Sequence, residues 1–241
     1  MEVRRLLKEQ LLTRFLELSG NIYPDLVRVF YTNLQLNGDI LVSHVKGVEL
    51  EITNEVWTAV TGLKFSGLKI NKGNTGIVDE FNKMKFYKNC LKDPQARVTK
   101  FGVRGLKLNE RLIAFIVSWI LTPRGNNHST LSEEDLVLIY CIMNKIKLNW
   151  IHIIKDHMQK AIRLCDFRYP YAILITKFLQ YFEVDRRRAG WSGEVLKWGK
   201  QWLFKKVKMK MLQKMLDQVL ILERKGLLQW HLWEACNQQN G

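Results

Sequence analysis

Hydrophobic side chains recur every three or four positions along most of the chain, which is the spacing of one face of an α-helix. Residues 1–19 show it first, and Gly20 follows as a helix stop. A proline in a first turn, Pro24, opens the next stretch. The same spacing predicts further helices over residues 24–36, 54–61, 78–91, 106–121, 131–145, 150–164 and 171–182.

One stretch departs from this spacing. Val48 to Ile52 alternates apolar and charged residues, the period-two pattern of a half-buried strand. The preceding residues from Ile40 favour extended backbone, and Lys46-Gly47 suits a turn. We therefore predict one small β-hairpin near residues 40–52, with the intervening carboxylates on its outer face.

Several boundaries carry helix and loop signals. Thr130 with Glu133 fits a capping box, and Asn149 is a suitable N-cap. The run from Thr122 to Asn127 breaks the apolar helix before it. Four glycines in residues 62–76 predict an irregular loop, and residues 95–105 read as a basic linker.

The predicted fold class is mainly α: a multi-helix globular domain with one small β-hairpin near residues 40–52, followed by a long basic amphipathic C-terminal helix. The expected divisions are an N-terminal amphipathic helix over 1–19, a helical domain over 20–185 and a tail over 186–241. Apolar residues of the tail keep helical spacing for about two heptads, fewer than a coiled coil needs.

The net charge of the chain adds an expectation about its partners. The chain has 38 Lys and Arg against 23 Asp and Glu, a net charge of +15. Such a balance favours an anionic partner, such as nucleic acid or an acidic lipid surface, although it also serves solubility alone. Nine of the basic residues and one acid, Glu194, fall within residues 186–210.

Tryptophans lie among the basic side chains of this tail. Lysines contact phosphates, and aromatic faces stack on unpaired bases, so the tail suits non-specific nucleic-acid binding. A basic amphipathic helix also suits a membrane surface, the less favoured partner, and core tryptophans beside a solvated face would explain the same pattern. The candidate nucleic-acid-binding residues are Arg186, Arg187, Arg188, Lys197, Trp198, Lys200, Trp202, Lys205, Lys206, Lys208 and Lys210.

The sequence contains no recognisable motif for catalysis. The four cysteines are too scattered for a zinc site, and His152 and His157 are five apart, a poor spacing for one helix face. The run Asn71 to Gly76 lacks the Gly-Lys-Ser/Thr ending of a phosphate loop. We expect no catalytic, metal-binding or cofactor-binding residues, no cofactor and no enzymatic activity.

The longest apolar run, Leu112 to Leu121, is far shorter than the roughly 20 residues that span a bilayer. No signal peptide is visible at the N-terminus, and so few cysteines indicate reduced thiols. The expected location is intracellular, in the nucleus or cytoplasm.

Several segments together resemble the plant transposon protein domain over about residues 20–185. The resemblance implies a plant source and a mobile-element reading frame, with the character of a capsid precursor of a retroelement. It implies no catalytic residues. The segments are Tyr23-Pro24, Val29 to Leu34, Val45 to Val48, Leu108 to Ile113, Trp119 to His128, Ser132 to Leu136, Asn144 to Trp150 and Tyr169 to Tyr171.

Three hypotheses follow. A structural, self-associating protein predicts a concentration-dependent oligomer. A nucleic-acid-binding module predicts salt-sensitive binding that is lost when the lysines of the tail are neutralised. An inactive relic of a retroelement predicts normal folding with neither property.

Overall fold

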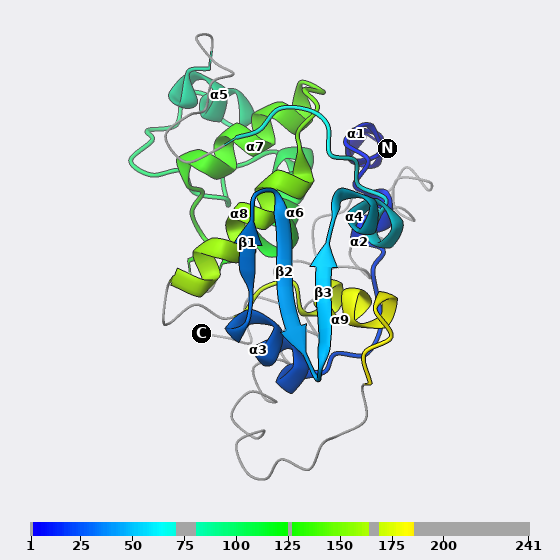
Figure 1. Cartoon of the computed structure of the whole chain (residues 1–241). Coiled ribbons are helices and arrows are strands. Elements are labelled where there is room, and N and C mark those ends of the chain that lie inside the picture. Colours follow the sequence, from blue (N-terminus) through cyan, green and yellow to red (C-terminus); the bar gives the residue numbers. More distant parts are fainter. Residues whose placement is uncertain (1, 71–80, 125–126, 164–168, 186–241) are drawn as a thin grey trace. The chain divides into compact units, whose positions relative to one another are not determined.

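Helices form most of the structure, and a small antiparallel sheet lies among them (Figure 1). The computed structural model describes residues 2–70, 81–124, 127–163 and 169–185, all of which belong to one unit, residues 2–186. The described elements are α1 (Glu2–Glu9), α2 (Thr13–Leu16), α3 (Pro24–Thr32), β1 (Gln35–Asn37), β2 (Ile40–Val45), β3 (Val48–Ile52), α4 (Asn54–Thr61), α5 (Lys83–Cys90), α6 (Leu108–Ile116), the π-helical turn η1 (Val117–Leu121), α7 (Glu133–Met143), α8 (Trp150–Arg163) and α9 (Ala172–Tyr181). The predicted mainly helical fold is confirmed, whereas the predicted C-terminal helix lies outside the described residues.

The sheet has the order β1-β2-β3, with both neighbouring pairs antiparallel. Val45 faces Val48 across the predicted turn, in which Lys46 and Gly47 take positive φ angles of 50° and 80°. That backbone suits the twist of a tight hairpin. The predicted hairpin is therefore confirmed, but a third strand, β1, pairs along β2 where a helix end had been predicted.

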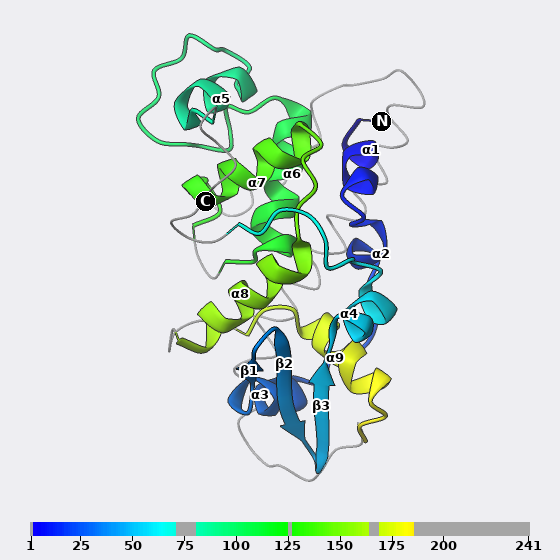
Figure 2. The same ribbon diagram turned by 45° about the horizontal axis from the view of Figure 1, so that its top comes forward.

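Alternate residues of β2 and β3 face the core, including Leu41, Leu50 and Ile52, each with no exposed surface. Helices α3, α4 and α9 contact these strands (Figure 2). Trp57 of α4 and Phe178 of α9 meet edge to face with their ring centroids 5.0 Å apart. The C-terminal helix of the described chain thus completes a core begun by its N-terminal strands.

The other part of the core joins the N-terminus to α6 and α7. Gln10, which is 4% exposed, donates to the Ile146 carbonyl at 2.8 Å. Its Oε1 accepts from the Leu148 backbone N–H at 3.3 Å and from the Trp150 indole at 3.2 Å. One buried amide therefore ties the first turns of the chain to the α7–α8 connection.

The structure corrects several element boundaries. The helix predicted over residues 1–19 is two helices, separated where Leu11 takes a φ of 59°. The helix predicted over 106–121 ends as an α-helix at Ile116 and continues as a π-helical turn. Of the helix predicted over 78–91, only Lys83–Cys90 is helical within the described residues.

Helix α5 is followed by a loop whose two ends meet. Leu91 and Leu106 form an antiparallel bridge, Lys92 N–H donates to Gly105 O at 2.9 Å, and Lys107 N–H donates to Cys90 O at 2.9 Å. Figure 2 shows this loop beside α5, at the opposite end of the described unit from the sheet. A surface loop with joined ends is an Ω-loop, a type that often carries function. The stretch predicted as a basic linker, 95–105, lies inside it.

Candidate functional site

All eleven candidate nucleic-acid-binding residues of the tail, from Arg186 to Lys210, lie outside the described residues. So does the whole glycine-rich run from Asn71 to Gly76. Within the described part of the chain, a network of polar contacts lies where η1 leads into α7. We call it the Arg124 network.

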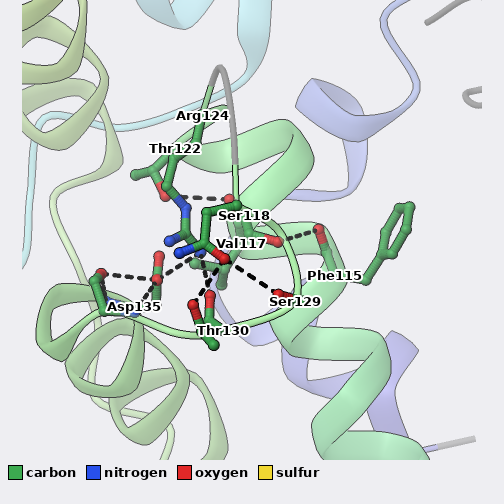
Figure 3. A network of polar contacts seen from close by, with 10 residues as sticks. Phe115, Val117, Ser118, Thr122, Arg124, Ser129, Thr130 and Asp135 are labelled. Atoms are coloured by element: carbon green, nitrogen blue, oxygen red, sulfur yellow. Dashed lines mark hydrogen bonds and ion pairs between the residues drawn. The ribbon is translucent and has the colours of Figure 1, made fainter. Parts of the chain in front are cut away.

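The Arg124 network begins at the π-helical turn (Figure 3). Thr122 donates to the Val117 carbonyl with its N–H at 2.8 Å and its hydroxyl at 3.1 Å. The following chain turns so that the Arg124 N–H donates to Ser118 O at 3.4 Å. The π-helical turn thus aims the Arg124 guanidinium back toward the start of α7.

Asp135 receives that guanidinium. Its Oδ2 lies 2.8 Å from Arg124 Nη2, and its side chain is only 4% exposed. The same oxygen accepts from the Ser132 N–H at 2.6 Å and hydroxyl at 2.7 Å, while Ser132 Oγ accepts from Asp135 N–H at 3.1 Å. The capping box is therefore Ser132 with Asp135, and the predicted pair of Thr130 with Glu133 is wrong. A charge-assisted cap of this kind holds the helix start rigidly.

A small pocket of about 80 Å³ lies between this network and α8. Ligand pockets usually measure roughly 300–1,000 Å³, so this one has room for a few water molecules only. Its charges are paired internally, because Lys160 lies 2.8 Å from Asp156 and 3.7 Å from Glu134, while Arg124 binds Asp135. This balance fits a structural network better than a binding site for a charged ligand.

His157 also lines the pocket, 5.6 Å from the ring of Tyr171 in an edge-to-face contact. Burial lowers the pKa of His157 to about 4, with Lys160 and Arg124 adding to the effect and Asp156 opposing it. The imidazole is therefore neutral at physiological pH, which agrees with a packed histidine.

A second buried polar group is Lys155 on α8, 5% exposed. Its ammonium donates to the carbonyl of Asp39 and to Asn54 Oδ1, and it lies 5.2 Å from the centre of the Phe65 ring. Burial lowers the pKa of Lys155, partly offset by Asp39. These contacts join α8 to α4 and to the turn between β1 and β2, so they give Lys155 a structural role.

Cys90 and Cys141 are buried thiols, and burial raises the pKa of each to about 12. A thiol protonated at neutral pH is a poor nucleophile. Both thiols are therefore packed side chains of the core, while Cys165 lies outside the described residues. No cluster of three or more potential metal ligands occurs among the described side chains. Nor does any described helix have the length and apolar character to span a bilayer.

Residues 9–185 match the family model described as "Putative plant retrotransposon-related domain". The chain belongs to this family. The retrotransposon-related domain begins before residue 20, which agrees with the packing of Gln10 into its core. No curated protein and no solved structure matched the chain.

Sequence reasoning missed the central pair of this domain's polar network. Arg124 and Asp135 were assigned to a helix break and a helix start, and nothing in the local pattern links them. One signal was present: an acidic residue three positions after Ser132 is the spacing of a capping box. The arginine becomes its partner only through the π-helical turn.

Proposed function

We propose that the retrotransposon-related domain is a structural, self-associating protein without enzymatic activity. The observation that carries this proposal is the open edge of its sheet. Among the described residues, strand β1 pairs with β2 on one side and with no strand on the other, and all three of its residues are exposed. An unpaired strand edge offers backbone hydrogen-bonding groups to another chain.

An apolar side chain lies on the same edge. Leu36 is paired with the buried Leu41, so it belongs to the core-facing side of the sheet, yet it is 42% exposed. Val29, on the adjoining helix α3, is 38% exposed. A second copy that pairs β1 with its own β1 about a two-fold axis would extend the sheet and cover Leu36.

The short length of strand β1 determines how strongly two copies are expected to associate. Three residues supply few ladder hydrogen bonds, and short edge strands associate weakly. We therefore expect a reversible oligomer whose population rises with protein concentration, rather than a permanent dimer.

Sedimentation of the full chain over a concentration series tests the proposal. The sedimentation coefficient should rise with concentration for the parent and for Met84→Lys, a control with 39% exposure on α5. Leu36→Lys should remain monomeric at the same concentrations. A parent that is monomeric throughout would contradict self-association, and an unaffected Leu36→Lys variant would place the contact elsewhere.

A second candidate function, nucleic-acid binding through the tail, is favoured by the charge of residues 186–210. They carry nine basic side chains and one acid. Neutralising Lys205, Lys206, Lys208 and Lys210 should weaken binding and flatten its salt dependence. If the full chain neither binds nor associates, an inactive relic is the better description.

A further inference from the structure

Net charge within the described domain is concentrated in α5 and the loop after it. Residues 82–107 hold eight lysines and arginines and one acid, Asp93, a net charge of +7. Residues 186–210 carry +8, so these two segments account for the whole net charge of +15. The rest of the chain is balanced, with 21 basic and 21 acidic residues. An excess confined to two segments points to a localised contact rather than to general solubility.

The fold holds the cations of the first segment on a fixed frame. Tyr87 and Cys90 are buried on one face of α5. Lys85 and Lys88, three positions apart, lie on its exposed face. Tyr87 also donates its hydroxyl to the Gly102 carbonyl at 2.7 Å, which fixes the far side of the loop against the helix.

The loop is fastened to the rest of the domain as well. Its Phe101 ring packs against Tyr87 with centroids 5.0 Å apart. Backbone hydrogen bonds run from Val103 N–H to Ser129 O at 3.0 Å and from Leu131 N–H to Phe101 O at 2.8 Å. The cations of the loop are therefore presented on an ordered frame, which lowers the entropy lost when a partner orders them.

Most of these cations remain available. All eight are exposed; Lys83 pairs with Glu133, and Lys107 donates to the Asn89 carbonyl. Asp93 accepts from the Gln95 N–H at 3.0 Å in a local turn. Five cations remain apart from Lys83, Lys92 and Lys107. Among the described side chains, no carboxylate forms an ion pair with any of these five. We name these the α5-loop cations: Lys85, Lys88, Arg97, Lys100 and Arg104.

We propose that the α5-loop cations form a nucleic-acid contact surface in the domain itself, separate from the tail. The surface binds the phosphate backbone and does not stack on bases, because its aromatic side chains Tyr87 and Phe101 are packed against each other. An acidic membrane fits less well, since insertion needs apolar side chains at the surface, and Met84 is the one large apolar residue of α5 that is exposed.

The test uses the full chain and a short labelled DNA duplex, with affinity measured across a salt series. One variant changes all five α5-loop cations to Gln. A matched control removes five exposed cations elsewhere: Arg4, Arg5, Lys8, Lys64 and Lys147. Circular dichroism and thermal unfolding confirm that both variants fold.

The α5-loop variant should lose at least about tenfold in affinity at ~100 mM salt, and the slope of log affinity against log salt should fall by about one for each phosphate contact removed. The control should stay close to the parent. An equal loss of affinity in both variants would overturn the proposal, because the loss would then follow from the lower net charge of the whole chain. Binding by the parent to anionic vesicles but not to DNA would also overturn it. This result is independent of self-association, which the Leu36→Lys variant tests without altering these cations.

Discussion

Gln10 and Trp150, far apart in the sequence, share a hydrogen bond of 3.2 Å between the amide Oε1 and the indole Nε1. The same amide binds the backbone of Ile146 and Leu148, so one side chain satisfies three buried polar groups. Its position within the first turns of the chain makes the N-terminus part of the domain rather than an appendage.

Gln10→Ala should lower the free energy of unfolding by about 3 kcal/mol, because it leaves the three buried partners of the amide unsatisfied. Denaturant titration measures this loss. Gln95→Ala, at an exposed position, is the control and should change stability by less than about 0.5 kcal/mol. Equal stability of the two variants would show that water replaces the amide without cost.

Breaking the Arg124–Asp135 pair should also destabilise the domain. We expect a loss of about 3 kcal/mol for Asp135→Ala, which removes a helix cap as well as a charge partner, and about 2 kcal/mol for the partly exposed Arg124→Met. The double variant should lose less than the sum, since both changes remove one interaction. Lys83→Met, which breaks an exposed pair, should cost less than about 0.5 kcal/mol. Additive losses would mean that the pair is not coupled.

The buried His157 predicts a dependence of stability on pH. Its pKa is about 4 in the folded domain against an ordinary value of 6.5. Between these values the unfolded chain binds more protons, so stability is present above pH 6.5 and is lost as the pH falls toward 4. The loss should approach, but not exceed, about 3 kcal/mol.

His157→Asn should flatten this part of the stability curve, measured by thermal unfolding at several pH values. His44→Gln is the control, because His44 lies on the exposed side of the sheet. A curve unchanged by the His157 substitution would assign the acid sensitivity to other groups.

The buried thiols should be slow to react. With a pKa of about 12, Cys90 and Cys141 hold roughly a thousandfold less thiolate than ordinary cysteines at pH 8. In a chain carrying Cys165→Ser and Cys236→Ser, maleimide labelling should be slow in the folded state and fast in guanidinium. Rapid labelling under native conditions would show that the surrounding core opens often.

The pattern of residues predicted the hairpin because burial of one face forces alternation in Val48–Ile52. It could not predict β1, since Gln35–Asn37 has no strand preference of its own and is extended through its pairing with β2. The break at Leu11 was hidden for a related reason: the apolar spacing continues across it, although Leu11 takes a φ of 59°.

The site shows the same limit. Thr130-Leu131-Ser132-Glu133 and Ser132-Glu133-Glu134-Asp135 both approximate a capping box, and the local pattern does not choose between them. The reciprocal hydrogen bonds between Ser132 and Asp135 decide, and the Arg124 guanidinium pairs with the Asp135 carboxylate of that capping box. The excess of basic residues in 82–107, in contrast, is evident from the sequence. The sequence does not show the bridge between Leu91 and Leu106, which holds these residues on one frame.

The contact between Trp57 and Phe178 can form only late in the synthesis of the protein on the ribosome. The ribosome makes the hairpin and α4 early and α9 only after most of the domain has been translated. Until α9 leaves the exit tunnel, this layer of the core cannot close. The nascent chain therefore carries an uncovered apolar sheet face through much of its synthesis, the state in which molecular chaperones engage their clients.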